Sequence, residues 1–294
     1  MAGLAIPLNA TITGAGFPIL RQDEILSDGS LMLLDASHYY GGFGSGVPVD
    51  NQAFENIAWK EAAALMSSDQ AGVRAWFDYY GGTGFTRERT GKGGLHFILS
   101  QAGDLGASVG AEIMMPTALR TYLAAHPSHA YYISTWTRLT KVAQNVVSGV
   151  TYKPATMTIQ STASSTSNYL GYFDKDDNSP LAASAKRLGS VQSNGANTLG
   201  NSFRAIAVDG WTGTLPSVAS DIRQGMVIAG ARGAYGGLAA SAGAPSFALY
   251  RLYIEDMTVS GRDYAEVEAI DLAAYTREFA AGGKFYGDTF TTPA

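Results

Sequence analysis

The chain has 294 residues, of which 46% are hydrophobic and only 15% are charged, so it can bury a substantial core. Its formal net charge of -5 argues against a basic nucleic-acid-binding surface, and no run of about 18 apolar residues predicts a membrane helix. Cysteine is absent, which excludes disulfides, thiolate metal sites and cysteine nucleophiles.

The chain is predicted to divide into an arm, a folded body and a tail. Residues 1–30 form the predicted arm, because short apolar alternations are broken there by Gly and Pro. Its start, MAGLAIPLNATITG, has neither a basic segment nor a long apolar run, so we expect no signal peptide and synthesis in a cytoplasm. Residues 31–281 are predicted to form the body, and residues 282–294 the C-terminal tail.

Short strands bounded by Gly, Ser, Asn or Asp are predicted along most of the body. In chain order they lie at residues 31–37, 73–82, 94–103, 130–143, 155–162, 167–174, 202–211, 225–233 and 246–255. Short helices are predicted at residues 55–66 and 116–127, the second with Pro116 at its first helical position. Many short strands with few helices indicate a mainly β fold, a two-sheet antiparallel sandwich or jelly roll.

The last predicted strand has two distinct faces, because alternate side chains point to opposite sides of a sheet. One face is predicted to be fully apolar, and its members are Ala248, Tyr250, Leu252 and Ile254. The other is predicted to be amphipathic, and its members are Phe247, Leu249, Arg251, Tyr253 and Glu255.

A closing helix is predicted directly after this strand. Ser260 is a candidate N-cap, with Asp263 three residues later in a capping-box arrangement. Apolar residues then recur at three- and four-residue steps, and glycines at positions 282 and 283 end the helix. The pattern therefore predicts that a mainly β body closes with one amphipathic helix.

Two segments carry a resemblance to a known family. They are YYISTWTRLTKVA at residues 131–143 and LYRLYIEDMTVSGRDYAEVEAID at residues 249–271. The order of features over residues 30–280 resembles the concanavalin A-like or laminin-G-like sandwich, as found in lectin-like domains of bacteriophage and prophage structural proteins. Sandwiches of this family serve lectins, glycosidases and inert virion parts alike, so the fold alone does not assign a function.

Two patterns that suggest catalysis or metal binding lack their partners. Residues 106–110 match G-x-S-x-G, but that motif needs a later histidine, and none lies beyond His129. His126 and His129 flank Pro127 and Ser128, close enough to share a metal if the turn allowed it. A third ligand is not evident, so we interpret this segment as a solvated turn and expect no metal there.

Two acidic groups were considered as catalytic or calcium-binding sites. Glu266, Glu268 and Asp271 resemble a permuted glucanase motif, but helix positions i and i+2 point about 200° apart, which favours a solvated helix face. In FDKDDNSP, Ca²⁺ is an alternative to a polar turn, because hard oxygen ligands follow a strand there. The candidate ligands are Asp174, Asp176 and Asn178. No other cofactor is expected.

Aromatic and polar residues that could bind sugars gather at two places. Trp76, Asp78, Tyr79 and Tyr80 lie together beside a Gly-Gly turn, and Tyr39 and Tyr40 precede another glycine pair. Exposed aromatic rings can cover the apolar face of a sugar, while carboxylates bind its hydroxyls. The alternative is that half of each set belongs to the core.

These observations predict a non-enzymatic structural protein of a bacteriophage virion, made in the host cytoplasm. We expect it to form homo-oligomers and to contact other virion proteins through its arm and tail, with neither nucleic acid nor a membrane as partner. It could serve as a tail, baseplate, collar or capsid-decoration protein. The alternatives are a glycan-binding adhesin or receptor-binding protein on the virion surface, and a polysaccharide-degrading enzyme with two carboxylates in a cleft.

Overall fold

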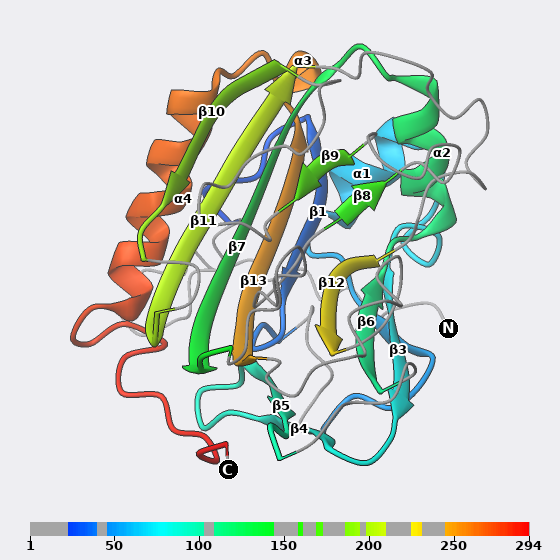
Figure 1. The fold of residues 1–294 in the computed structure, drawn as a ribbon. Helices are drawn as coiled ribbons and strands as arrows, with labels where there is room; N and C mark the ends of the chain where they lie inside the picture. Colours follow the sequence, from blue (N-terminus) through cyan, green and yellow to red (C-terminus); the bar gives the residue numbers. More distant parts are fainter. Residues whose placement is uncertain are drawn as a thin grey trace, which may run out of the picture.

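A computed structural model describes residues 23–39, 46–102, 109–143, 158–160, 169–172, 186–194, 198–209, 225–230 and 245–293. Within these ranges the chain forms two main antiparallel sheets, a separate two-stranded sheet and four helices (Figure 1). This architecture confirms the predicted mainly β sandwich with few short helices.

The larger sheet is organised around β13. β7 pairs along one edge of β13, while β5 and β1 share its other edge. Beyond β7 the sheet continues through β11 to β10, and beyond β5 it continues to β4. The bounds are β1 Ser30–Asp35, β4 Phe85–Arg89, β5 Leu95–Leu99, β7 Ala130–Lys141, β10 Lys186–Gln192, β11 Gly200–Asp209 and β13 Ser246–Asp256.

The smaller sheet has the strand order β12–β6–β3–β2, and β8 pairs with β9 in the two-stranded sheet. Their bounds are β2 Gln52–Phe54, β3 Ala75–Gly81, β6 Gly110–Met114, β8 Thr158–Gln160, β9 Tyr169–Tyr172 and β12 Gly225–Gly230. The helices are α1 Trp59–Leu65, α2 Thr117–Ala125, α3 Met257–Ser260 and α4 Tyr264–Phe279.

The described elements form three layers, with the larger sheet in the middle. Side chains of both main sheets, such as Phe77 and Phe97, fill the core between them. On the other face of the larger sheet, Trp136 and Phe203 pack with Tyr275 of α4. Figure 1 shows α4 beside β10 and β11, on the side away from the smaller sheet. Both faces of the larger sheet are therefore covered.

The predicted faces of β13 are wrong beyond Tyr250, because the pairing with β7 shifts register between Leu249 and Arg251. Such a bulge inserts one extra residue and turns every later side chain to the opposite face. The core between the sheets receives Phe247, Leu249, Leu252 and Ile254, and the layer under α4 receives Ala248, Tyr250 and Tyr253. Because both faces are covered, all of β13 is buried.

The predicted start of the closing helix is also wrong. Ser260 is the last residue of the separate short helix α3, which is capped by Asp256 and ends at Gly261 with a φ of 71°. A positive φ of this size favours glycine and ends the helix. The N-cap of α4 is Asp263, whose carboxylate accepts from the backbone of Glu266 in a complete capping box.

Asp271 is buried in the interface between α4 and β7, so the predicted solvated face is wrong at this position. Its carboxylate accepts hydrogen bonds from the hydroxyl of Tyr132 at 3.0 Å, from Nε1 of Trp136 at 2.9 Å, and from the hydroxyl of Ser134. Burial raises the pKa of Asp271, and neighbouring Arg251 together with these donors opposes the rise. The carboxylate thus fastens α4 to three residues of one strand.

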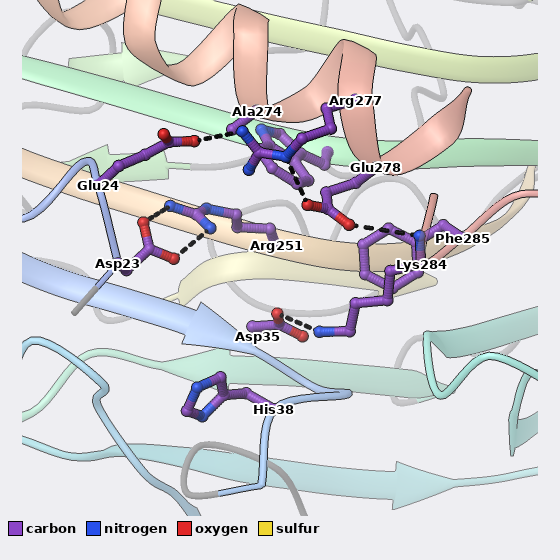
Figure 2. Close-up of a pocket in the computed structure, with 11 residues that line it drawn as sticks. Asp23, Glu24, Asp35, His38, Arg251, Ala274, Arg277, Glu278, Lys284 and Phe285 are labelled. Carbon is purple, nitrogen blue, oxygen red and sulfur yellow. Dashed lines mark hydrogen bonds and ion pairs between the residues drawn. The ribbon is translucent and has the colours of Figure 1, made fainter. Parts of the chain in front are cut away.

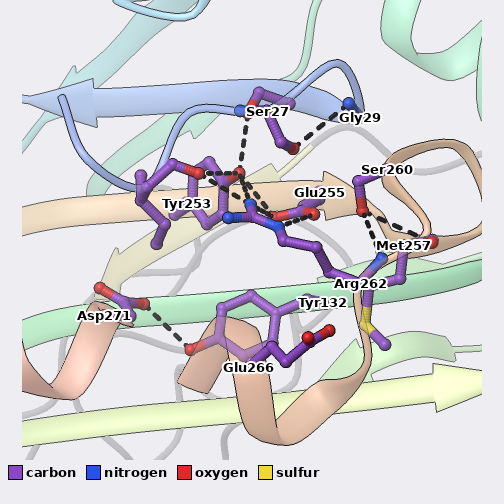
Figure 3. A network of polar contacts seen from close by, with 12 residues as sticks. Ser27, Gly29, Tyr132, Tyr253, Glu255, Met257, Ser260, Arg262, Glu266 and Asp271 are labelled. Atoms are coloured by element: carbon purple, nitrogen blue, oxygen red, sulfur yellow. Dashed lines mark hydrogen bonds and ion pairs between the residues drawn. The ribbon is translucent and has the colours of Figure 1, made fainter. Parts of the chain in front are cut away.

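A second buried network joins the N-terminal segment, β13 and the chain between α3 and α4 (Figure 3). The hydroxyl of Tyr253 donates to Glu255 at 2.7 Å and lies 2.8 Å from the hydroxyl of Ser30. Arg262 donates from Nε to Glu255 at 2.9 Å and also reaches the carbonyl of Ile25 at 2.7 Å. The buried carboxylate of Glu255 is therefore paired, as a charge inside a protein must be.

The described parts of the predicted arm and tail pack on the body. Asp23 binds Arg251 through two hydrogen bonds of 2.8 and 2.9 Å. In the tail, Asp288 accepts from the hydroxyl of Tyr250 at 2.8 Å, and Thr291 donates to Glu88 of β4 through its backbone at 2.7 Å and its hydroxyl at 2.6 Å. Both segments thus continue the folded unit.

Replacing Asp271 by Ala should lower the free energy of unfolding by about 3 kcal/mol or more, because it leaves buried donors without an acceptor at roughly 1–3 kcal/mol each. Chemical denaturation measures the change. The control is Glu268→Ala, a half-exposed carboxylate of the same helix, which should cost less than about 0.5 kcal/mol. Equal losses in the two variants would contradict a special role for Asp271.

The contact between Thr291 and Glu88 should weaken in acid. Burial raises the pKa of Glu88, but hydrogen bonds from Thr291 and His96 outweigh it, so the pKa lies below its ordinary value of 4.5. The contact is fully present above pH 4.5 and is lost as the pH falls through the lowered pKa. Hydrogen exchange of the Thr291 amide, corrected for intrinsic rates, should accelerate only in acid.

Glu88→Gln should accelerate this exchange at neutral pH as well, whereas Glu268→Gln should not. An acid response that persists in Glu88→Gln would contradict the assignment to Glu88.

Candidate functional site

The predicted sugar-binding residues of β3 divide between the two faces of the smaller sheet. Phe77 is fully buried in the core between the sheets, and Tyr79 stacks on it with ring centroids 6.3 Å apart. Because side chains alternate along a strand, Trp76, Asp78 and Tyr80 share the outer face. The structure thus brings three of the four residues together and places Tyr79 on the opposite face.

The outer-face residues are arranged as an aromatic and acidic surface. Trp76 is 40% exposed, and the guanidinium of Arg74 lies 5.5 Å from the centre of its ring. The hydroxyl of Tyr80 donates to the carboxylate of Asp78. A ring beside an oriented carboxylate supplies both the apolar and the polar contact that a sugar uses.

Tyr79 is held on the inner side by its own contacts. The guanidinium of Arg87 lies 3.5 Å from its ring centre, and its backbone N–H donates to the carboxylate of Asp50 at 2.9 Å. These contacts help to fix β3 next to the loop that precedes β2. Tyr79 therefore has a structural role.

Glu112 of β6 is a member of this surface that the sequence analysis missed. It is the cross-strand partner of Asp78 and is only 5% exposed. Directly opposed residues of antiparallel strands have Cβ atoms roughly 4.5–5.5 Å apart, so the side chains of Asp78 and Glu112 leave the sheet next to each other. The signal that could have found it is the short segment Gly110–Met114, which is bounded by glycine and followed by Pro116.

The remaining predicted sites are less informative. Tyr39 is 89% exposed and follows β1 of the larger sheet, not the smaller one. Tyr40 and the candidate calcium ligands Asp174, Asp176 and Asn178 lie outside the described residues. Within the described ranges, no three His, Asp or Glu side chains are grouped closely enough to hold a metal ion.

A cavity of about 440 Å³ lies where the N-terminal segment, the end of α4 and the tail meet (Figure 2). Its charged side chains largely bind one another. Arg277 bridges Glu24 at 2.8 Å and Glu278 at 3.0 Å, and Lys284 binds Asp35 at 2.9 Å. These ion pairs join segments from both ends of the described chain. The charged residues that line the cavity therefore hold these segments together.

The floor of this cavity is formed by Trp136 and Arg251. The Arg251 guanidinium lies 4.6 Å from the centre of the Trp136 ring and also binds Asp23. Burial raises the pKa of Asp23, but Arg251 outweighs it, so the pKa is lowered. The N-terminal segment is therefore held by an ionised carboxylate.

A shallow, mostly apolar groove lies between Leu188 of β10, an outer strand of the larger sheet, and the chain from α3 to the start of α4. Its apolar lining is Leu188, Met257, Tyr264, Ala265 and Ala130, and its polar lining is Thr258, Arg262 and Asp263. Leu188 is 39% exposed. Gly189 allows the ring of Tyr264 to lie against β10, since a Cβ there would come within 2.2 Å of the ring. In the described part of the chain, β11 is the one strand that pairs with β10.

Among the described residues, no helix is long and apolar enough to cross a membrane. Comparison with known proteins adds no relative: no family model matches the chain, and neither a curated protein nor a solved structure is similar enough to count as a match. The class that the fold defines is a mainly β, two-sheet antiparallel sandwich.

Proposed function

We propose that this protein is a non-enzymatic structural component of a bacteriophage virion with a concanavalin A-like sandwich. It would be made in the host cytoplasm and act in the virion through contacts between its own copies and with other virion proteins. The observation that supports this proposal is the β10 edge of the larger sheet, together with the apolar groove beside it.

The edge of a sheet presents backbone N–H and C=O groups in the spacing that another strand requires. Addition of a strand supplies main-chain hydrogen bonds, and a neighbouring pocket for side chains supplies specificity. At β10 this pocket is the groove that Leu188 and Tyr264 line. The edge therefore has both components of a strand-addition site.

The occupant that we propose is residues 1–22 of a second copy, the part of the predicted arm that precedes Asp23. This segment leads into Asp23, which Arg251 fixes to the body. An extended chain of this length spans up to about 70 Å, enough to reach a neighbouring molecule. Its sequence contains short apolar alternations such as ATIT at residues 10–13.

Deleting residues 1–22 should leave a folded monomer, because the deletion spares Asp23. Light scattering after size exclusion should show the loss of the oligomer, while the circular dichroism spectrum still shows a folded chain; the melting temperature should fall by the stabilisation that assembly supplied. Leu188→Lys should weaken assembly in the same way, because it places a charge in the groove. The control is Leu199→Lys, an exposed leucine outside the groove. A truncated protein that still assembles would rule out the arm.

A second candidate function is glycan binding by the outer face of the smaller sheet. It is favoured by the exposed ring of Trp76, which shares this face with Asp78 and Tyr80, and by the neighbouring carboxylate of Glu112. A virion protein with this surface would act as an adhesin or receptor-binding protein. A further alternative is hydrolysis of a polysaccharide, a reaction that uses two carboxylates such as Asp78 and Glu112.

Trp76→Ala should abolish binding on a glycan array, because it removes the ring that would stack on the sugar. Tyr286→Ala is the matched control, since Tyr286 is an exposed aromatic residue of the tail. An array without signal for the unmodified protein would count against the function. Release of reducing ends from a bound glycan, lost in Glu112→Gln, would instead support a hydrolase.

A further inference from the structure

The turn between α2 and β7 brings two histidine rings together. His126 is the C-cap of α2, where its backbone N–H donates to the carbonyl of Tyr122 at 3.0 Å. The backbone N–H of His129 then donates to the carbonyl of His126 at 3.2 Å and closes the turn. The ring centroids of His126 and His129 lie 4.8 Å apart, with 48° between the ring planes.

Each ring is oriented through its Nδ1 atom. Nδ1 of His126 lies 2.8 Å from the carbonyl oxygen of Tyr122, and Nδ1 of His129 lies 2.6 Å from a carboxylate oxygen of Asp256. A carbonyl can only accept, and the Asp256 carboxylate accepts here as it does from the hydroxyl of Tyr122 at 2.7 Å. Nδ1 therefore carries the hydrogen in both neutral rings, and Nε2 keeps its lone pair.

This arrangement is the one that metal-binding histidines adopt. The ring nitrogen that does not bind the metal donates to a carboxylate or a backbone carbonyl, which fixes the tautomer and the orientation of the ring. Both kinds of partner occur here, the carboxylate of Asp256 behind His129 and the carbonyl of Tyr122 behind His126. Both histidine side chains reach the surface.

The spacing of the rings also fits a shared ion. With Zn–N bonds of about 2.0–2.1 Å, two imidazoles on one tetrahedral Zn²⁺ have ring centroids roughly 5 Å apart. The observed centroid separation of 4.8 Å is close to this value. The separation of the two rings therefore fits a shared ion.

We propose that His126 and His129 form a binding site for Zn²⁺ through their Nε2 atoms. In the described ranges no third His, Asp or Glu side chain joins them, so water completes the coordination shell. The chain has four histidines, and His96 does not compete, because its two ring nitrogens bind Glu88 and Thr140 at 2.8 Å each.

Calorimetric titration of the full chain with ZnCl₂ tests the proposal. The protein must carry no histidine tag, and the pH is held constant and mildly alkaline, because the metal competes with protons for the ring nitrogens. We expect one ion per chain. His126→Ala and His129→Ala should each weaken binding by about tenfold or more, while His38→Ala should leave it unchanged.

A second measurement on the unmodified protein keeps the test independent of how the variants fold. Long-range ¹H–¹⁵N spectra should show Zn²⁺ shifting the Nε2 signals of two histidines, while their Nδ1–H groups remain. The proposal fails if neither heat nor an Nε2 shift appears up to about 1 mM Zn²⁺, the weak end of measurable affinity. It also fails if the double variant His126→Ala/His129→Ala binds Zn²⁺ as the unmodified protein does.

Discussion

The burial of charged groups along β13 is the constraint on which the rest of the structure depends. This strand has neighbours on both edges and packed layers on both faces, yet it contains Arg251, Glu255 and Asp256. A buried charge is strongly destabilising unless it is paired, so each one requires a partner from elsewhere in the chain. Arg251 forms an ion pair with Asp23, which fixes the N-terminal segment. Glu255 forms an ion pair with Arg262, which fixes the chain between α3 and α4.

Periodicity predicted the sandwich, most long strands and the existence of α4, because these depend on local alternation of apolar residues. It could not predict which way β13 faces after Tyr250, since the bulge is set by pairing with β7. β10 was not predicted either, because KRLGSVQ has little apolar alternation and becomes a strand by pairing with β11. The burial of Asp271 was not predicted either, because it depends on a contact between distant parts of the chain. Its three donors lie on a strand more than 130 residues away.

The candidate sites were partly readable in the sequence. That Trp76, Asp78 and Tyr80 could act together follows from their alternation on one strand, but Glu112 joins them only through the register between β3 and β6. The spacing of His126 and His129 was visible in the sequence. The orientation of the two rings depends on two structural features that the spacing does not reveal. One is the end of α2 at His126, and the other is the position of Asp256 behind His129.

The pairing of β1 with β13 has a consequence for how the molecule is made. Among the described strands β1 pairs with β13 alone, and the contact between Ser30 and Tyr253 spans 223 residues, so this pairing must wait until almost the whole chain has been translated. At about 5–20 residues per second, this is roughly 10 to 45 s on the ribosome. During that interval the apolar sequence LMLL of β1 must be kept from aggregation by other means. The larger sheet is thus assembled near the end of synthesis, with its first strand among the last to be incorporated.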